Sequence, residues 1–109
     1  MFVIVDISAE GNQRPPLGAP IRVEARDTSL ADAPSETVGA ADSEVRGQSG
    51  SWLDTVELEV PRLPSQCTVW AHVDVDRDGR VSRGDFITTA AYPVAPDGEA
   101  RVAVRVRRV

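Results

Sequence analysis

The sequence lacks several residues and patterns on which common classes of protein depend. It contains no lysine and a single cysteine, Cys67. A lone cysteine cannot form an intramolecular disulfide, so the fold must depend on a buried core, for which 109 residues are long enough. A nucleophilic thiol would need a base beside it, and His72 is the single histidine. We expect Cys67 to be a small buried apolar residue, the usual role of a free cysteine.

Charge and hydropathy exclude two more classes of protein. The 12 basic residues are all arginine and face 17 acidic residues, which gives a net charge of -5 and an isoelectric point near 4.7. A nucleic-acid-binding protein would need a basic surface, so we expect no nucleic-acid partner. No stretch approaches the roughly 20 apolar residues of a membrane-spanning helix.

The first residues carry no targeting signal. Residues 1–6 lack the basic start, the long apolar stretch and the cleavage site of a secretory signal peptide. As written, the sequence predicts a cytoplasmic protein. If the chain is a trimmed piece of a longer precursor, the expectation changes to the periplasm or the extracellular space.

Hydrophobic residues alternate with polar ones along most of the chain, which is the two-residue period of a β-strand. No segment combines helix caps with a sustained helical period. Gly, Pro, Asp and Ser separate the alternating stretches, as in the turn predicted at 96–98. The pattern predicts one domain, residues 1–109, folded as an antiparallel β-sandwich of the transthyretin or immunoglobulin type. We expect about seven strands, near residues 2–8, 21–26, 37–45, 56–60, 69–75, 86–92 and 102–106.

Residues 74–85 carry the strongest chemical signal, Asp-Val-Asp-Arg-Asp-Gly-Arg-Val-Ser-Arg-Gly-Asp. The spacing matches the D-x-D-x-D-G calcium loop with an acidic residue at its last position. Calcium takes about six to eight oxygen ligands, and alternate carboxylates reach one ion if the chain turns sharply, which Gly79 permits. The predicted ligands are the side chains of Asp74, Asp76 and Asp78, the Arg80 carbonyl, Ser82 directly or through a water, and Asp85.

Two departures from the usual loop affect this hypothesis. Asp85 stands where the longer glutamate is usual, so we expect one ligating oxygen rather than two, which weakens binding or favours magnesium. The flanking segments have strand patterns, so a structural staple is favoured over a switch that opens a helix pair. Val81, at the apolar eighth position, is expected to anchor the loop to the core. The alternative is a plain hairpin turn at Asp78-Gly79.

Two further groups of residues have both a functional and a structural interpretation. Trp70 and His72 share one strand face, which is either a ligand platform with an extra metal ligand or part of a core or half-covered sheet. Arg101, Arg105 and Arg107 line one face of the last strand, where they either bind an anion or an acidic partner or protect an exposed edge. The structural interpretation is favoured in both cases.

Several segments resemble the bacterial YbaY/YscW family. Residues 16–35 contain Gly-Ala-Pro-Ile-Arg-Val and Asp-Thr-Ser-Leu-Ala-Asp-Ala-Pro, and residues 70–74 and 92–94 fall where the family has similar strands. The resemblance covers most of the chain after Leu17 and implies a small β-sandwich. The family's better-known members are lipoproteins that chaperone or pilot outer-membrane secretins of type III secretion. The sequence departs from them in lacking a lipobox cysteine and a signal peptide, and the resemblance transfers no catalytic residues.

These observations lead to two hypotheses about function. The first is a non-enzymatic calcium-binding module in which the ion orders the loop 74–85. The alternative is a chaperone- or pilotin-like adaptor that binds a secretion or envelope protein through an exposed edge strand or the loop 27–35, with the Asp loop incidental. An enzyme is least favoured, because a metal wrapped by the loop leaves no open position for substrate.

Overall fold

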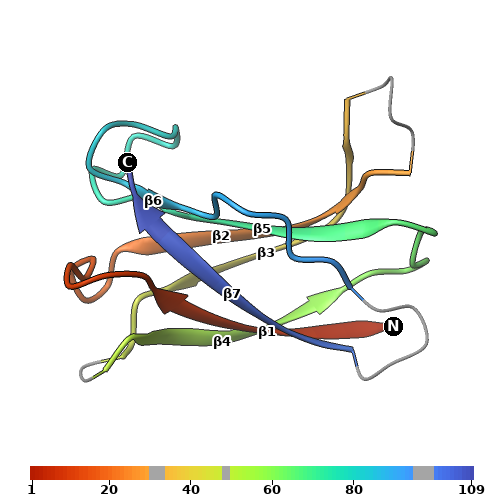
Figure 1. Ribbon diagram of the computed structural model, residues 1–109, viewed down its shortest axis with the longest axis horizontal. Coiled ribbons are helices and arrows are strands. Elements are labelled where there is room, and N and C mark those ends of the chain that lie inside the picture. Colours follow the sequence, from red (N-terminus) through yellow and green to blue (C-terminus); the bar gives the residue numbers. More distant parts are fainter. Residues whose placement is uncertain (30–33, 48–49, 95–99) are drawn as a thin grey trace.

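The computed structural model describes residues 1–29, 34–47, 50–94 and 100–109, which form seven β-strands (Figure 1). The turn predicted at 96–98 lies outside these residues, and the predicted loop at 27–35 lies partly outside them. Within the described part of the chain, no helix is long and apolar enough to cross a membrane. The strands are β1 (Phe2–Ala9), β2 (Pro20–Asp27), β3 (Glu36–Glu44), β4 (Trp52–Glu59), β5 (Cys67–Val73), β6 (Phe86–Ile87) and β7 (Arg101–Arg108).

All seven strands belong to one sheet in the order β3-β2-β5-β6-β7-β1-β4. β1 and β7 run parallel, with Val5 opposite Val102, and the other neighbours are antiparallel. The sheet curls until its edge strands, β3 and β4, pack against each other, which gives a nearly closed barrel (Figure 1). The all-β prediction is confirmed, and the expected antiparallel sandwich is corrected to a mixed, curled sheet.

Two local predictions are also corrected. The strand expected at 86–92 is limited to β6, because the chain leaves the ladder after Ile87 and returns to β5 in an isolated bridge between Thr68 and Pro93. Arg107 does not protect an edge, because it lies where β7 pairs with β6. Arg101 and Arg105 lie on the part of β7 that pairs with β1 alone. The edges are β3 and β4, whose sequences contain six acidic residues and no basic residue.

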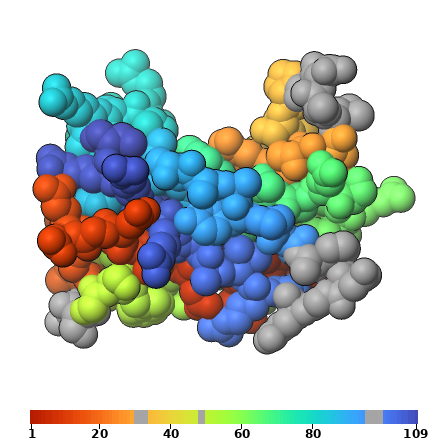
Figure 2. All heavy atoms as spheres, viewed as in Figure 1, coloured from red at the N-terminus to blue at the C-terminus, as the bar shows by residue number. Residues whose placement is uncertain are grey.

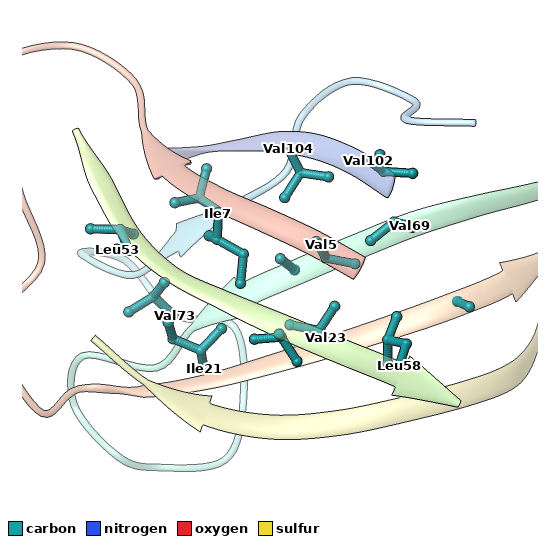
Figure 3. Packing of buried hydrophobic residues seen from close by; sticks show 14 of the residues in the cluster. Val5, Ile7, Ile21, Val23, Leu53, Leu58, Val69, Val73, Val102 and Val104 are labelled. Atoms are coloured by element: carbon teal, nitrogen blue, oxygen red, sulfur yellow. The ribbon is translucent and has the colours of Figure 1, made fainter. Parts of the chain in front are cut away.

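The core lies inside the barrel and consists mainly of valine, isoleucine and leucine at alternate strand positions (Figure 3). Burying one such side chain fully stabilises the fold by about 1.5–3 kcal/mol relative to leaving it exposed. Cys67 is buried in this core, as expected. On β5, Val69 and Val73 face the core, so the alternating Trp70 and His72 lie on the outward face.

The seam between β3 and β4 depends on close approach of two backbones. A Cβ atom added to Gly39 would lie 2.6 Å from the carbonyl oxygen of Glu59. At the other end of the seam, the N–H groups of Arg46 and Gly47 both donate to the carbonyl of Leu53 at 2.9 Å. Glycine at position 39 therefore lets the barrel close.

Gly39→Ala should lower the free energy of unfolding by about 1–3 kcal/mol, the usual cost of overpacking, because the new Cβ pushes the seam apart. Ala40→Val is the control, since the next residue on the strand is exposed and should tolerate added volume. Urea denaturation of the two variants measures the difference. If Gly39→Ala is as stable as the unchanged protein, the seam is not closely packed.

Candidate metal centre

Residues 74–85 connect β5 to β6 and form the projection near the C-terminus in Figure 1. The ladder on both sides is intact, with Val73 opposite Phe86 and His72 opposite Ile87. The prediction of a strand on each side of the loop is therefore confirmed, with the second strand limited to the two residues of β6. The loop begins and ends on neighbouring strands, which brings its first and last residues together.

Asp85 anchors the loop to the barrel. Its side chain is buried, with 1% of its surface exposed, although it is acidic. The carboxylate oxygen Oδ2 lies 2.8 Å from Nε2 of His72 and accepts a hydrogen bond of 3.1 Å from the N–H of Ser82. The other oxygen, Oδ1, accepts a 2.9 Å hydrogen bond from the N–H of Val75. One carboxylate thus joins β5 to the first and the last turn of the loop.

These contacts decide the charge of Asp85. Burial raises the pKa of its carboxyl, but the hydrogen bonds from His72, Ser82 and Val75 outweigh burial and hold the pKa below its ordinary value. The group is therefore ionised at neutral pH. A carboxyl with a lowered folded-state pKa stabilises the fold above its unfolded-state pKa of about 3.9, and this contribution is lost as the pH falls through the folded-state value.

The hydroxyl of Ser82 lies at the centre of the other predicted ligands. Its Oγ lies 2.9 Å from Asp76 Oδ2 and 3.0 Å from Asp78 Oδ2, and either oxygen can accept its one proton. The Arg80 carbonyl oxygen is 3.3 Å from the same hydroxyl, and Asp85 Oδ2 is 3.5 Å from it. The spacing of the sequence therefore brings these oxygen atoms to one point.

Asp74 completes the cluster from the end of β5. One carboxylate oxygen from each of Asp74, Asp76, Asp78 and Asp85 lies within 4.8 Å of the others. Asp74 Oδ2 accepts the N–H of Gly79 at 2.8 Å, whereas Asp74 Oδ1 is buried without a hydrogen-bond partner. A buried acceptor without a partner costs free energy, which a cation would offset. The donor set is all oxygen, as hard cations such as calcium prefer, and so it fits the ion.

Repulsion among the exposed carboxylates of the cluster also favours a bound cation. The Ser82 hydroxyl lowers the pKa of Asp76, but desolvation and the carboxylates of Asp74 and Asp78 outweigh it, so this pKa is raised. The pKa of Asp78 is lowered, chiefly by the N–H of Arg80. Among the described residues, no ion pair within 4.0 Å joins a loop arginine to these carboxylates. A bound cation would relieve this repulsion.

The backbone turns at two left-handed positions on either side of Asp78. Gly79 has φ 76°, as its predicted role in the turn requires, and Arg77 has φ 59°. The positive φ of Arg77 could not be predicted from the sequence, since non-glycine residues adopt this conformation uncommonly. Its guanidinium donates a 3.1 Å hydrogen bond to the Gly18 carbonyl, which ties the loop to the connection before β2.

Two expectations about neighbouring residues are resolved. Val81 was expected to anchor the loop to the core, but 49% of its surface is exposed, so this prediction is wrong. The anchor is Asp85, whose partner His72 is a buried residue of β5. His72 also forms a candidate ligand group with Asp74 and Asp85. The strand face shared by Trp70 and His72 had suggested an extra metal ligand as one of its two interpretations.

Comparison with known proteins gives one clear likeness, which concerns the fold. No family model and no curated protein matches the chain. The curled all-β sheet defines a fold that is shared with a solved secretion-system accessory protein. That protein is an alternative pilotin from the type II secretion system of Vibrio cholerae, with 21% identity, a TM-score of 0.74 and coverage of 100% of this chain and 96% of the other.

In buffer containing EDTA, Asp85→Ala should lower the free energy of unfolding by about 3 kcal/mol, since hydrogen bonds to charged groups contribute about 1.5–3 kcal/mol each and do not add fully. Asp76→Ala, the same change at an exposed carboxylate of the same loop, should cause no loss. Urea denaturation at a series of pH values measures both. The deficit of Asp85→Ala should shrink as the pH falls through the lowered pKa of Asp85. If the two variants are equally stable at neutral pH, the carboxylate of Asp85 does not anchor the loop to the barrel.

Proposed function

We propose that the protein is a non-catalytic adaptor that binds a protein of a bacterial secretion system or cell envelope. The observation that carries this proposal is the match of the whole chain to the fold of the alternative pilotin, at a TM-score of 0.74. The resemblance of residues 16–35 to the YbaY/YscW family supports the same class of function. A loop that wraps one ion leaves no open position for a substrate, which also favours binding over catalysis.

The two surfaces expected to bind the partner differ in what the structure offers. The edge strands β3 and β4 pack against each other, and the hydrogen bonds from Arg46 and Gly47 to Leu53 close one end of their seam. Addition of a partner strand there would have to open the barrel. The loop 27–35 lies partly outside the described residues. A partner surface away from the seam is therefore favoured.

Affinity-tagged protein mixed with the solubilised envelope of its own bacterium should retain a secretion or envelope protein that mass spectrometry identifies. The double variant Asp76→Ala, Asp78→Ala should retain the same partner, because Asp85 still holds the loop. An unrelated tagged β-barrel protein serves as the control bait. The adaptor proposal fails if the unchanged protein retains no such partner above the control.

We propose as a second function that the loop 74–85 binds one calcium ion as a structural staple. The specific observation is the buried, unpaired Oδ1 of Asp74 within a cluster of four carboxylates. Asp74, Asp76 and Asp78 would bind through side chains, Arg80 through its carbonyl and Ser82 through its hydroxyl. Asp85 would add a single oxygen, because both of its oxygens already accept hydrogen bonds, Oδ2 from His72 and Ser82 and Oδ1 from Val75.

Millimolar calcium should raise the melting temperature by several degrees, because a ligand at about 100 times its Kd adds about 2.7 kcal/mol to stability. Differential scanning fluorimetry in EDTA, calcium and magnesium measures the shift. Asp76→Ala with Asp78→Ala should abolish it. The matched control is Glu57→Ala with Glu59→Ala, which removes two exposed carboxylates at alternate positions of β4 and should keep the shift. If calcium leaves the melting temperature of the unchanged protein the same, the loop does not bind the ion.

A further inference from the structure

A groove of about 490 Å³ lies on the outward face of the sheet, beside the loop 74–85. β2 and β5 form its floor, β3 contributes one side and the loop forms the opposite wall. Figure 2 shows the surface hollowed between the cyan projection that contains the loop and the orange and yellow projection at the far ends of β2 and β3. Six of its lining residues matter here: Arg22, Glu24, Asp42, Trp70, Asp74 and Val81.

The strand register places the side chains of the floor next to one another. Arg22 on β2 lies opposite Asp42 on β3 and opposite His72 on β5. One step along the same outward face, Glu24 lies opposite Trp70. The indole is half-buried, so part of it faces the groove. The floor is therefore an aromatic ring surrounded by charged groups.

The charge of the groove is negative. Glu24, Asp42 and Asp74 contribute three carboxylates, and Arg22 is the one cationic residue among the groove's described lining residues. The guanidinium of Arg22 is already shared between Glu24 at 3.4 Å and Asp42 at 3.3 Å. Arg26 at the rim also lies 3.2 Å from Glu24, so two arginines face the three carboxylates. A cationic group that enters the groove would therefore meet one carboxylate in excess of the arginines.

Apolar surface accompanies this charge. Val81 is half exposed on the loop wall, and Trp70 lies on the floor. Trp70 already accepts a cation at the rim, since the guanidinium carbon of Arg26 lies 4.3 Å from the ring centroid. Aliphatic stems that end in a positive charge fit such a surface, because the stem packs on apolar atoms while the head stays near carboxylates.

We propose that this groove receives an arginine or lysine side chain, flanked by aliphatic residues, from the protein partner of the adaptor. The inference rests on the adaptor function proposed above and names the surface and the chemistry of the partner. The loop contributes Val81 to the groove, and the contacts of Asp85 with His72, Val75 and Ser82 hold that wall in place. The groove therefore exists with or without an ion in the loop.

Two capped peptides, Leu-Arg-Leu-Arg-Leu and Leu-Glu-Leu-Glu-Leu, are the probes. Nuclear magnetic resonance titration of the full isotope-labelled chain, in EDTA and in calcium, measures their affinity. The arginine peptide should shift the indole N–H of Trp70 and the amides of Glu24 and Val81, and should bind at least about tenfold more tightly than the glutamate peptide. Equal affinity of the peptides, or shifts confined to other strands, would overturn the proposal.

Val81→Arg should lower the affinity for the arginine peptide by at least about tenfold, because the new side chain fills the groove and adds a like charge. Leu17→Arg is the matched control, since Leu17 is likewise an exposed aliphatic residue, at 56% exposure, and does not line the groove. This control should bind as the unchanged protein does. If Val81→Arg binds the arginine peptide as tightly as the unchanged protein does, the groove is not the binding site and the proposal is overturned.

The capture experiment with the same two variants separates this inference from the adaptor function. If Val81→Arg still retains the identified envelope partner at the level of Leu17→Arg, the groove is not the partner site, and the adaptor function stands. If the unchanged protein retains no envelope partner but binds the arginine peptide, the adaptor function fails, and the cation-binding groove stands. If Val81→Arg loses the partner while Leu17→Arg retains it, the result supports both the adaptor function and the groove as its binding site.

Discussion

The arrangement of the site depends on one buried carboxylate, that of Asp85. Its two oxygens contact His72 on β5, the N–H of Val75 at the start of the loop and the N–H of Ser82 near its end. This contact folds residues 74–85 back over the outward face of the sheet. The position of the loop then brings Asp74, Asp76 and Asp78 together and places Val81 on the wall of the groove.

The curled sheet supplies the rigid frame on which this anchor acts. The outward face of β2 and β5 lies beside the loop and forms the floor of the groove. The loop is held at both ends by paired strands, so an ion in it would staple a hairpin in place. The proposed partner site and the proposed metal site thus lie on adjoining surfaces of one frame.

The sequence predicted the features that depend on local spacing. Alternation located six strands within a few residues, and the Asp spacing predicted a ligand set whose oxygen atoms do converge. It could not predict contacts between distant segments, such as the parallel pairing of β1 with β7, because alternation carries no strand direction. The contact between Asp85 and His72 also joins segments that are distant in the sequence, because the loop folds over β5. Val81 faces the groove because a strand, β6, follows the loop in place of the helix that follows the usual calcium loop.

Amide hydrogen exchange of the loop, measured in EDTA and again in calcium, shows directly whether Asp85 holds the loop and whether calcium then orders its remaining turns. The N–H groups of Val75 and Ser82, which donate to Asp85, should be protected already in EDTA. The N–H groups of Gly79 and Arg80, which donate to Asp74 and Asp78, should gain protection when calcium is added. Unprotected exchange of all four groups in EDTA, or no change at Gly79 and Arg80 in calcium, would contradict these roles of Asp85 and calcium.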